Sequence, residues 1–308
     1  MKYFNLGREK IASSRVILGC MRIADKPLKE VEQLLCAALE SGVNTFDHAD
    51  IYGGGESEKI FGEAVKNLGI ARDKTVLQSK CAIRTTKRGA KAFDFSREYI
   101  LSSVEGSLKR LQTDHLDTLL LHRPDALLDE HEVAEAFCAL KKAGKVRAFG
   151  VSNFSAGQTR LLESAGVEIV ANQLQFSLMH AGLVEAGFYV NMNNAEGINR
   201  DGEIYPYCRE RGIAVQAWSP LYYGFFEGVF VGNEKFPELN KELERLAERY
   251  GCSSTAIAFA WILRLPAMQA VAGTTRAARI REIAKAADIQ LTRDEWYELY
   301  AATGKILP

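Results

Sequence analysis

Four ionisable side chains in this sequence could carry out proton transfer. Asp47 and Tyr52 follow the apolar run 43–46, and Lys80 and His122 each come directly after a later, mostly apolar run. A carboxylate, a phenol, an amine and an imidazole are groups that serve as general acids and bases. Taken singly, each has a simpler explanation, such as a helix-capping acid, a packed tyrosine, a solvated lysine or a hydrogen-bonded histidine. Four such groups after three separate apolar runs favour a shared site, because burying isolated ionisable groups is costly.

These four groups together would suit the reduction of a carbonyl. Lys80 beside Asp47 would stay charged and fixed in place. A cation near Tyr52 lowers the pKa of the phenol, which is normally about 10, and makes it a usable general acid near neutral pH. His122 would hydrogen-bond a substrate carbonyl and orient it. None of these side chains supplies electrons, so a cofactor must donate a hydride. The alternative chemistry is an isomerase or aldolase in which Lys80 forms a Schiff base.

Apolar runs alternate with helix-type patterns along the chain, and this alternation would position the four groups. A turn at 6–8 predicts an N-terminal hairpin that pairs residues 2–10 with 11–14. Short, uniformly apolar runs predict strands that are buried on both faces, which we expect at 15–19, 43–46, 75–79, 116–121, 146–151, 168–172, 213–218 and 270–273. Apolar spacing, a cap at Ser96 and a capping-box-like Asp129 with Glu132 predict helices, which we expect at 28–41, 57–67, 96–111, 129–143, 155–165, 201–211, 238–250, 254–263, 277–287 and 293–302.

Eight strand–helix units predict an α/β fold, a (β/α)8 TIM barrel with a short N-terminal hairpin and extra C-terminal helices. The carboxyl ends of barrel strands meet at one mouth. The polar residues expected there are Asp47, Lys80, His122, Ser152, Asn153, Gln173 and Ser219. An open doubly wound sheet is the alternative, but it lacks the dinucleotide fingerprint, because Glu58 stands where the third glycine after Gly53–Gly55 should fall. One domain over residues 1–308 is the simplest organisation.

Composition limits the partners and the compartment. Lysine plus arginine and aspartate plus glutamate both number 39, so no net charge attracts nucleic acid or an anionic membrane. The start of the chain shows no secretory signal, and no apolar run approaches the roughly 20 residues that span a bilayer. The six cysteines show no CxxC spacing, which favours reduced thiols. We therefore expect a cytoplasmic protein without a metal site, either a monomer or a weak homo-oligomer.

Seven motifs resemble those of the aldo-keto reductase superfamily, and they extend over essentially the whole chain. They are FDHADIYGGGESE (46–58), QSK (78–80), LLLHRPD (119–125), GVSNF (150–154), NQLQFS (172–177), AWSPL (217–221) and VAGTTRAAR (271–279). The resemblance implies a catalytic tetrad of Asp47, Tyr52, Lys80 and His122. In that tetrad Tyr52 would donate the proton, Lys80 and Asp47 would adjust the acidity of Tyr52, and His122 would orient the carbonyl.

The same resemblance implies NADPH as the cofactor. Ser152, Asn153 and Gln173 would bind the carboxamide, and Trp218 would stack on the nicotinamide. The remaining contacts implied are Ser219, Pro220 and Leu221 along the pyrophosphate, Gly273, Thr274 and Thr275 at the adenosine phosphates, Arg279 at the 2′-phosphate and Glu282 at the adenine. Gly273 replaces a basic residue of many members and Ile283 replaces a common asparagine. These two departures leave NADH possible as well.

The sequence leaves the substrate open beyond a small carbonyl compound. We expect residues 176–200 to form an extended loop with at most short turns. The pocket would be walled by Met21, Tyr52, Cys81, residues 176–189 and an aromatic loop after Leu221. A second function remains, a nucleotide-binding regulatory subunit of the same fold with negligible turnover, although the intact tetrad argues against it.

Overall fold

A closed barrel of eight parallel strands forms the centre of the computed structural model, which describes residues 1–193, 195, 197–200, 202–224 and 227–308. Around the barrel the strand order is β10-β11-β12-β3-β4-β5-β8-β9. The bounds are β3 Val16–Gly19, β4 Thr45–Asp47, β5 Val76–Cys81, β8 Leu116–Leu121, β9 Val146–Ser152, β10 Ile169–Gln175, β11 Ala214–Trp218 and β12 Met268–Ala272. The eight predicted strands all occur, and the (β/α)8 barrel is confirmed.

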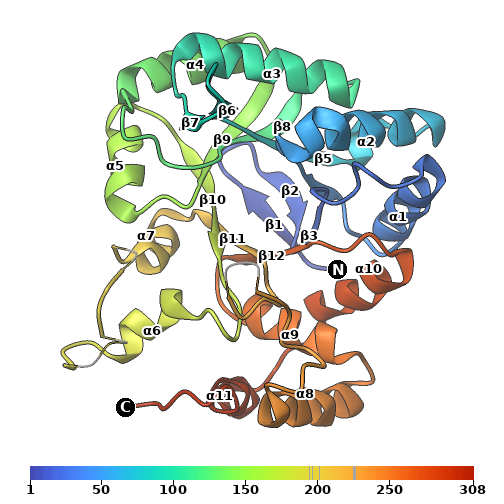
Figure 1. Ribbon diagram of the computed structural model, residues 1–308, viewed down its shortest axis with the longest axis vertical. Helices are drawn as coiled ribbons and strands as arrows, with labels where there is room; N and C mark the ends of the chain where they lie inside the picture. The colour runs from blue at the N-terminus through green and yellow to red at the C-terminus, as the bar shows by residue number, and fades with distance from the viewer. Residues whose placement is uncertain (194, 196, 201, 225–226) are drawn as a thin grey trace.

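Helices surround the strands (Figure 1). Those that follow barrel strands are α1 Leu28–Glu40, α2 Glu56–Asn67, α3 Arg97–Leu111, α4 Glu130–Lys142, α5 Ala156–Ser164, α7 Ile204–Arg211, α9 Ser254–Leu263 and α10 Ala277–Ala284. The additional helices are α6 Gly182–Phe188, α8 Pro237–Tyr250 and α11 Arg293–Ala301, and the short 3-10 turns are η1 Tyr52–Gly55, η2 Arg72–Lys74 and η3 Lys285–Ala287. In Figure 1, α6, α8 and α11 lie together on one side of the barrel.

Side-chain caps explain where several helices begin. Ser96 accepts from the backbone N–H of Tyr99 and so starts α3, as predicted. Asp129 caps α4, but the predicted capping box with Glu132 is wrong, because the Glu132 carboxylate instead accepts from the backbone N–H of Arg97. That bond joins the starts of two neighbouring helices.

The predicted hairpin closes the bottom of the barrel. β1 (Tyr3–Leu6) pairs antiparallel with β2 (Ile11–Ser14). Leu6 and Ile11 are buried against the lower strand residues, including Leu120 and Val170. The hairpin therefore leaves the opposite end, at the carboxyl ends of the strands, as the open mouth.

Two local predictions are wrong, and one small hairpin was not predicted. Residues 176–200 are not simply a loop, since they contain α6, and a small hairpin of β6 (Ile83–Thr85) and β7 (Lys91–Phe93) was not predicted. The expectation that the strands are uniformly apolar is also wrong, because four of them contain a buried glutamine. α7 begins at Ile204; the predicted start at Asp201, and Phe225 and Phe226 of the aromatic loop, lie outside the described residues.

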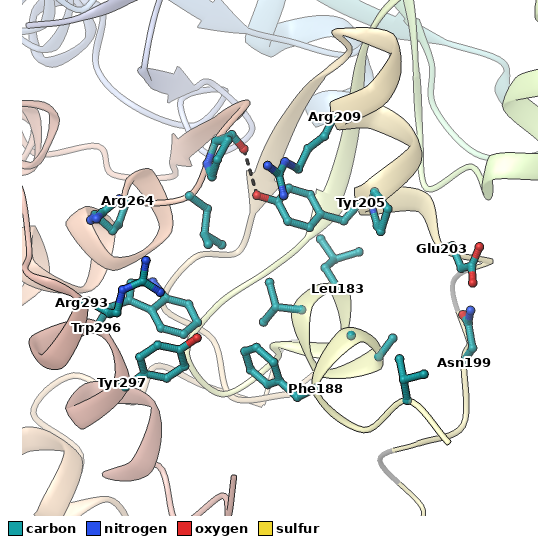
Figure 2. A pocket seen from close by; sticks show the side chains of 17 residues that line it. Leu183, Phe188, Asn199, Glu203, Tyr205, Arg209, Arg264, Arg293, Trp296 and Tyr297 are labelled. Atoms are coloured by element: carbon teal, nitrogen blue, oxygen red, sulfur yellow. Dashed lines mark hydrogen bonds between the residues drawn. The ribbon is translucent and has the colours of Figure 1, made fainter. Parts of the chain in front are cut away.

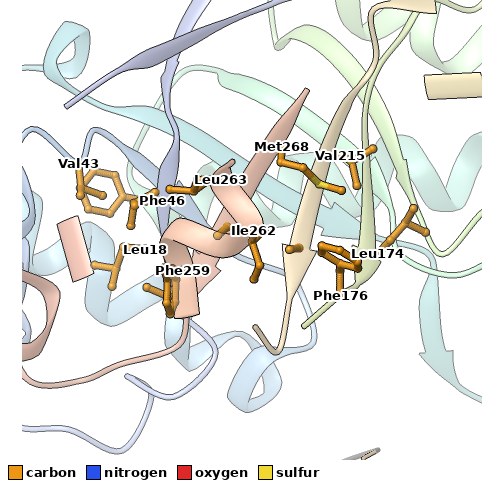
Figure 3. Close-up of a cluster of buried hydrophobic side chains, with 14 of the residues drawn as sticks. Leu18, Val43, Phe46, Leu174, Phe176, Val215, Phe259, Ile262, Leu263 and Met268 are labelled. Carbon is orange, nitrogen blue, oxygen red and sulfur yellow. The ribbon is translucent and has the colours of Figure 1, made fainter. Parts of the chain in front are cut away.

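α9 packs the C-terminal helices onto the barrel. Its residues 256–263 are all buried, as expected for a helix that is apolar on every side. Figure 3 shows Phe259, Ile262 and Leu263 in a cluster with side chains of the strands. Trp261 of α9 stacks on Trp296 of α11 with ring centroids 4.7 Å apart, and each indole N–H donates to the other residue's backbone carbonyl. No helix in the described part of the chain is long and apolar enough to cross a membrane.

Candidate active site

Asp47 and Lys80 form a buried ion pair at the mouth of the barrel. Asp47 is the last residue of β4, and Lys80 lies next to the end of β5. The Lys80 ammonium lies 2.7 Å from both Asp47 oxygens and 2.9 Å from the His48 carbonyl. Neither side chain is exposed beyond 3%. A buried pair is tolerated only when further hydrogen bonds complete it, and the Asp47 Oδ1 atom also accepts from the side-chain amides of Gln78 and Gln173.

Tyr52 completes a chain of three groups. It begins the η1 turn, whose Gly53 and Gly54 adopt positive φ angles of 59° and 66° that glycine allows. The phenol oxygen lies 3.2 Å from the Lys80 ammonium. Burial raises the pKa of Tyr52 above its ordinary value, and the charge of Lys80 opposes this shift without reversing it. The expectation of a net lowered phenol pKa is therefore wrong for the protein alone, and the phenol remains protonated at neutral pH.

His122 faces the phenol from the end of β8. Its ring meets that of Tyr52 edge-on, with centroids 5.9 Å apart and an angle of 83°. Burial, with Lys80 and Arg123 nearby, lowers the pKa of His122 to about 2. The imidazole is therefore neutral and offers one ring N–H as a donor. All four residues of the predicted tetrad thus lie at one place.

A buried acidic cluster anchors the strand that carries Lys80. The Glu58 carboxylate of α2 accepts from the Ser79 hydroxyl at 2.5 Å and from Arg110 of α3 at 2.7 Å. Glu58, which stands in place of the third glycine of a dinucleotide fingerprint, therefore connects α2 to β5 and to α3. Asp50 lies beside this cluster, and burial, with a contribution from Glu58, raises the pKa of Asp50 to about 7.

The residues predicted to hold a nicotinamide form a connected row beside the tetrad. The Ser152 hydroxyl donates to the backbone carbonyl of Gln173, the Asn153 amide donates to Ser152, and the Trp218 indole donates to Asn153. Asn153 has a φ of 63°, an uncommon left-handed conformation for a residue other than glycine. Strain of this kind is characteristic of ligand sites. Gln173 is the exception in this row, because both protons of its amide are donated into the barrel interior.

The row continues along the segment after β11. Ser219 has a φ of 51° and accepts from the backbone N–H of Tyr222, which folds the chain into a turn. Pro220 is buried and Leu221 is half-buried in this turn. These three residues therefore follow Trp218 directly at the mouth.

The predicted phosphate residues lie at the start of α10, directly after β12. Thr274 is buried and its hydroxyl accepts from the backbone N–H of Arg276, while Thr275 is half-buried. Gly273 is exposed, and apart from its two chain neighbours no atom of the described residues lies within 4 Å of the place where a Cβ would stand. Arg279 and Glu282 are exposed on the helix. A helix N-terminus with open backbone in front of it suits an anion.

The sequence did not reveal two features of the site. Gln78 and Gln216, which join the Asp47 hydrogen-bond set, are visible in the sequence only as polar letters inside apolar runs. Arg123 lies with its guanidinium carbon 5.7 Å from the centre of the Trp218 ring. Cys81, expected in the pocket wall, is buried, and burial raises the pKa of its thiol, which makes it a packing residue.

A separate cavity of about 600 Å³ lies among α6, α7 and α11. Figure 2 shows Phe188, Tyr205 and Trp296 around it, with the Tyr205 hydroxyl donating to the carbonyl of Pro266. None of the tetrad residues lines this cavity. It is therefore distinct from the barrel mouth.

A parallel barrel with a buried acid and amine and a half-buried phenol and imidazole at its carboxyl rim is the arrangement of a barrel enzyme. Comparison with known proteins identifies the family. Residues 15–303 match the model of the aldo/keto reductase family, and the chain belongs to that family. It is an oxidoreductase, as the sequence predicted.

Individual relatives agree over nearly the full length. The chain is 37% identical to 6-dehydroglucose reductase of Agrobacterium fabrum, with 96% of this chain and 97% of the relative covered. It is 35% identical to oxidoreductase YdhF of Escherichia coli, with 96% and 95% covered. Among solved structures, an aldo-keto reductase from Klebsiella pneumoniae in complex with NADPH superposes with a TM-score of 0.77 at 24% identity, covering 97% and 93% of the two chains.

Proposed function

We propose that this protein reduces an aldehyde or ketone to the alcohol, with NADPH as hydride donor and Tyr52 as proton donor. The observation that carries this proposal is the position of the Lys80 ammonium, which contacts the Tyr52 phenol and the Asp47 carboxylate at once. That arrangement suits a phenol that must give up a proton during the reaction.

The residues present fit a dinucleotide. The strained Asn153 and the hydrogen-bonded row to Trp218 offer donors and an aromatic face next to the tetrad. The open backbone at Gly273, in front of α10, offers a phosphate cradle. Ser152, Asn153, Gln173 and Trp218 would hold the nicotinamide. Ser219, Pro220 and Leu221 would line the pyrophosphate, and Gly273, Thr274, Thr275, Arg279 and Glu282 would hold the adenosine end. When bound, this cofactor supplies a hydride to the carbonyl carbon.

The protein's own residues handle the proton. Neutral His122 donates a hydrogen bond to the carbonyl oxygen and orients it over Tyr52. As negative charge develops on that oxygen, the Tyr52 hydroxyl transfers its proton and becomes a phenolate. The Lys80 ammonium stabilises the phenolate, and Asp47 holds Lys80 in place. The charge of Lys80 stabilises the developing phenolate more than the neutral phenol, and this difference accelerates the reaction.

A turnover assay tests the proposal. Purified protein with NADPH and a panel of aldehydes, ketones and dicarbonyls should consume the reduced nucleotide. Tyr52→Phe should lose about 100-fold or more in kcat while its NADPH dissociation constant, followed by tryptophan fluorescence, stays nearly unchanged. Tyr250→Phe, which alters a tyrosine of α8 far along the chain, is the matched control.

Two outcomes would count against this function. If Tyr52→Phe keeps the kcat of the wild type, Tyr52 is not the proton donor. NADPH binding with no turnover on any carbonyl of the panel would favour a nucleotide-binding regulatory subunit.

A further inference from the structure

Four buried glutamines fill part of the barrel interior. They are Gln78 on β5, Gln173 on β10, Gln216 on β11 and Gln269 on β12, and none is more than 4% exposed. The interior of such a barrel is usually filled by branched apolar side chains. Amides in a core are costly unless every donor and acceptor is used. The arrangement therefore calls for an explanation beyond filling space.

The four amides form one continuous hydrogen-bonded chain. At the top, the Nε2 atoms of Gln78 and Gln173 donate to Asp47 Oδ1 at 2.6 and 3.0 Å. Both also donate to Gln216 Oε1, at 2.8 and 3.2 Å. The Nε2 atom of Gln216 donates to Gln78 Oε1 at 3.0 Å and to Gln269 Oε1 at 3.2 Å.

The chain ends in the hairpin at the bottom of the barrel. The Nε2 atom of Gln269 donates to the hydroxyl of Ser13 at 2.7 Å and to the backbone carbonyl of Ser14 at 2.9 Å. Ser13 is bonded in turn to Thr45, on the strand that ends in Asp47. Each of the four Nε2 atoms in the chain thus uses both of its protons.

The chemistry of the two ends fixes the direction of every amide between them. The Ser14 carbonyl can only accept, so Gln269 must present its nitrogen downward and its oxygen to Gln216. Gln216 must then give its nitrogen to Gln269, which leaves its own oxygen for Gln78 and Gln173. Their nitrogens consequently face the Asp47 carboxylate, which also only accepts. Reversing any one amide would place two oxygens against each other.

We infer that Gln216 is a positioning residue for carbonyl reduction, because it holds the amides of Gln78 and Gln173 in the one orientation that directs both of them at Asp47 Oδ1. The inference rests on the proposed function, since it concerns the same tetrad. With these two amides and Lys80, three donors converge on that oxygen. The carboxylate is thereby fixed, and the Lys80 ammonium stays aligned with the Tyr52 phenol. Gln269 contributes one step further away, through Gln216 alone.

Three variants and one control test this role. Gln216→Met and Gln269→Met keep side-chain length but remove the amide, and the double variant combines them. Thr118→Val is the control. Thr118 is fully buried, stands in register with Gln78 on the neighbouring strand, and its hydroxyl has no partner among the described residues. It therefore reports the effect of altering the barrel interior without removing a hydrogen bond of the amide chain.

The expected kinetic result separates positioning from folding. Gln216→Met should lower kcat about tenfold and Gln269→Met about threefold, with the NADPH dissociation constant changed less than about twofold. The double variant should be no slower than Gln216→Met, because the two residues act in series. Thr118→Val should keep wild-type kcat. If Gln216→Met does not fold, Gln269→Met carries the same test.

A second measurement needs no cofactor. In ¹H–¹⁵N spectra of the nucleotide-free protein, the side-chain amide signals of Gln78 and Gln173 should exchange slowly with solvent, and should shift in Gln269→Met but not in Thr118→Val. Unshifted signals, a folded Gln216→Met with kcat within about twofold of wild type, or multiplicative effects in the double variant would overturn the inference. Absence of turnover in the wild-type protein would instead refute the proposed function, and the spectra would still report on the amide chain.

Discussion

The ammonium group of Lys80 lies 3.2 Å from the phenol oxygen of Tyr52. Lys80 is fully buried, and its charge is matched by Asp47. Burial lowers the pKa of Lys80, but the charges of Asp47 and Tyr52 and the hydrogen bonds to both together outweigh burial and raise the pKa above its ordinary value. Lys80 therefore stays charged beside a phenol that stays protonated, which is the state that the proposed reduction requires before the proton moves.

The buried pair gives a prediction for stability. Lys80→Met leaves Asp47 charged without its cation, and should lower the free energy of unfolding by about 3–5 kcal/mol. Adding Asp47→Asn should restore part of this loss, because the unpaired charge is removed. Urea denaturation of the two variants measures both effects. A double variant that is less stable than Lys80→Met would contradict this account.

Arg279 gives a prediction for cofactor choice. Its guanidinium is exposed at the start of α10, where it would meet a 2′-phosphate. Arg279→Ala should weaken NADPH binding about tenfold and leave NADH binding nearly unchanged, since a charge-assisted contact to phosphate is worth about 1.5 kcal/mol or more. Arg281→Ala is the matched control, because Arg281 on the same helix is paired with Glu40. Equal losses of affinity for NADPH and NADH would show that Arg279 does not contact the 2′-phosphate.

Arg123 gives a prediction for substrate preference. Its guanidinium lies against the Trp218 ring and close to Tyr52 and His122, and burial lowers its pKa. A half-buried cation at the mouth should favour carbonyl compounds that carry a carboxylate. Arg123→Leu should lower kcat/KM for 2-carboxybenzaldehyde about tenfold relative to benzaldehyde, as expected for the loss of one charge-assisted contact. An unchanged ratio between the two aldehydes would show that Arg123 does not face the substrate.

Asp50 gives a prediction for the pH dependence of stability. Burial raises the pKa of Asp50 to about 7 from 3.8, so the folded state binds a proton more tightly than the unfolded chain. The contribution of Asp50 to stability is therefore complete below pH 3.8 and is lost as the pH rises towards 7. A shift of roughly three pH units corresponds to at most about 4 kcal/mol.

Replacing this carboxyl by an amide should remove the penalty. Asp50→Asn should gain more unfolding free energy over the wild type at pH 8 than at pH 4, because the penalty exists only at the higher pH. Denaturant unfolding at the two pH values measures the difference. The same gain at both pH values would mean that burial and the nearby Glu58 do not hold Asp50 in its neutral form.

The sequence by itself determined the architecture and the residues of the proposed tetrad. Eight short strands alternating with helices close into a barrel, and a barrel brings the residues at its strand ends to one rim whatever their distance along the chain. This is why Asp47, Lys80 and His122 could be placed together from their positions after apolar runs. The cap at Ser96 and the hairpin 3–14 could likewise be predicted, because both depend on the local spacing of residues.

Only the tertiary structure decided the electrostatics and the direction of the hydrogen bonds. The pKa of Tyr52 moves upward because burial outweighs the lysine beside it, and burial is a sum over many elements that no local pattern contains. Gln78 and Gln216 read as interruptions of apolar runs, and Gln173 as a residue after a strand, until the closed barrel places their amides in contact. Their orientation is set by Asp47 at one end and by the Ser14 carbonyl at the other, and only the folded chain brings these two acceptors into one line.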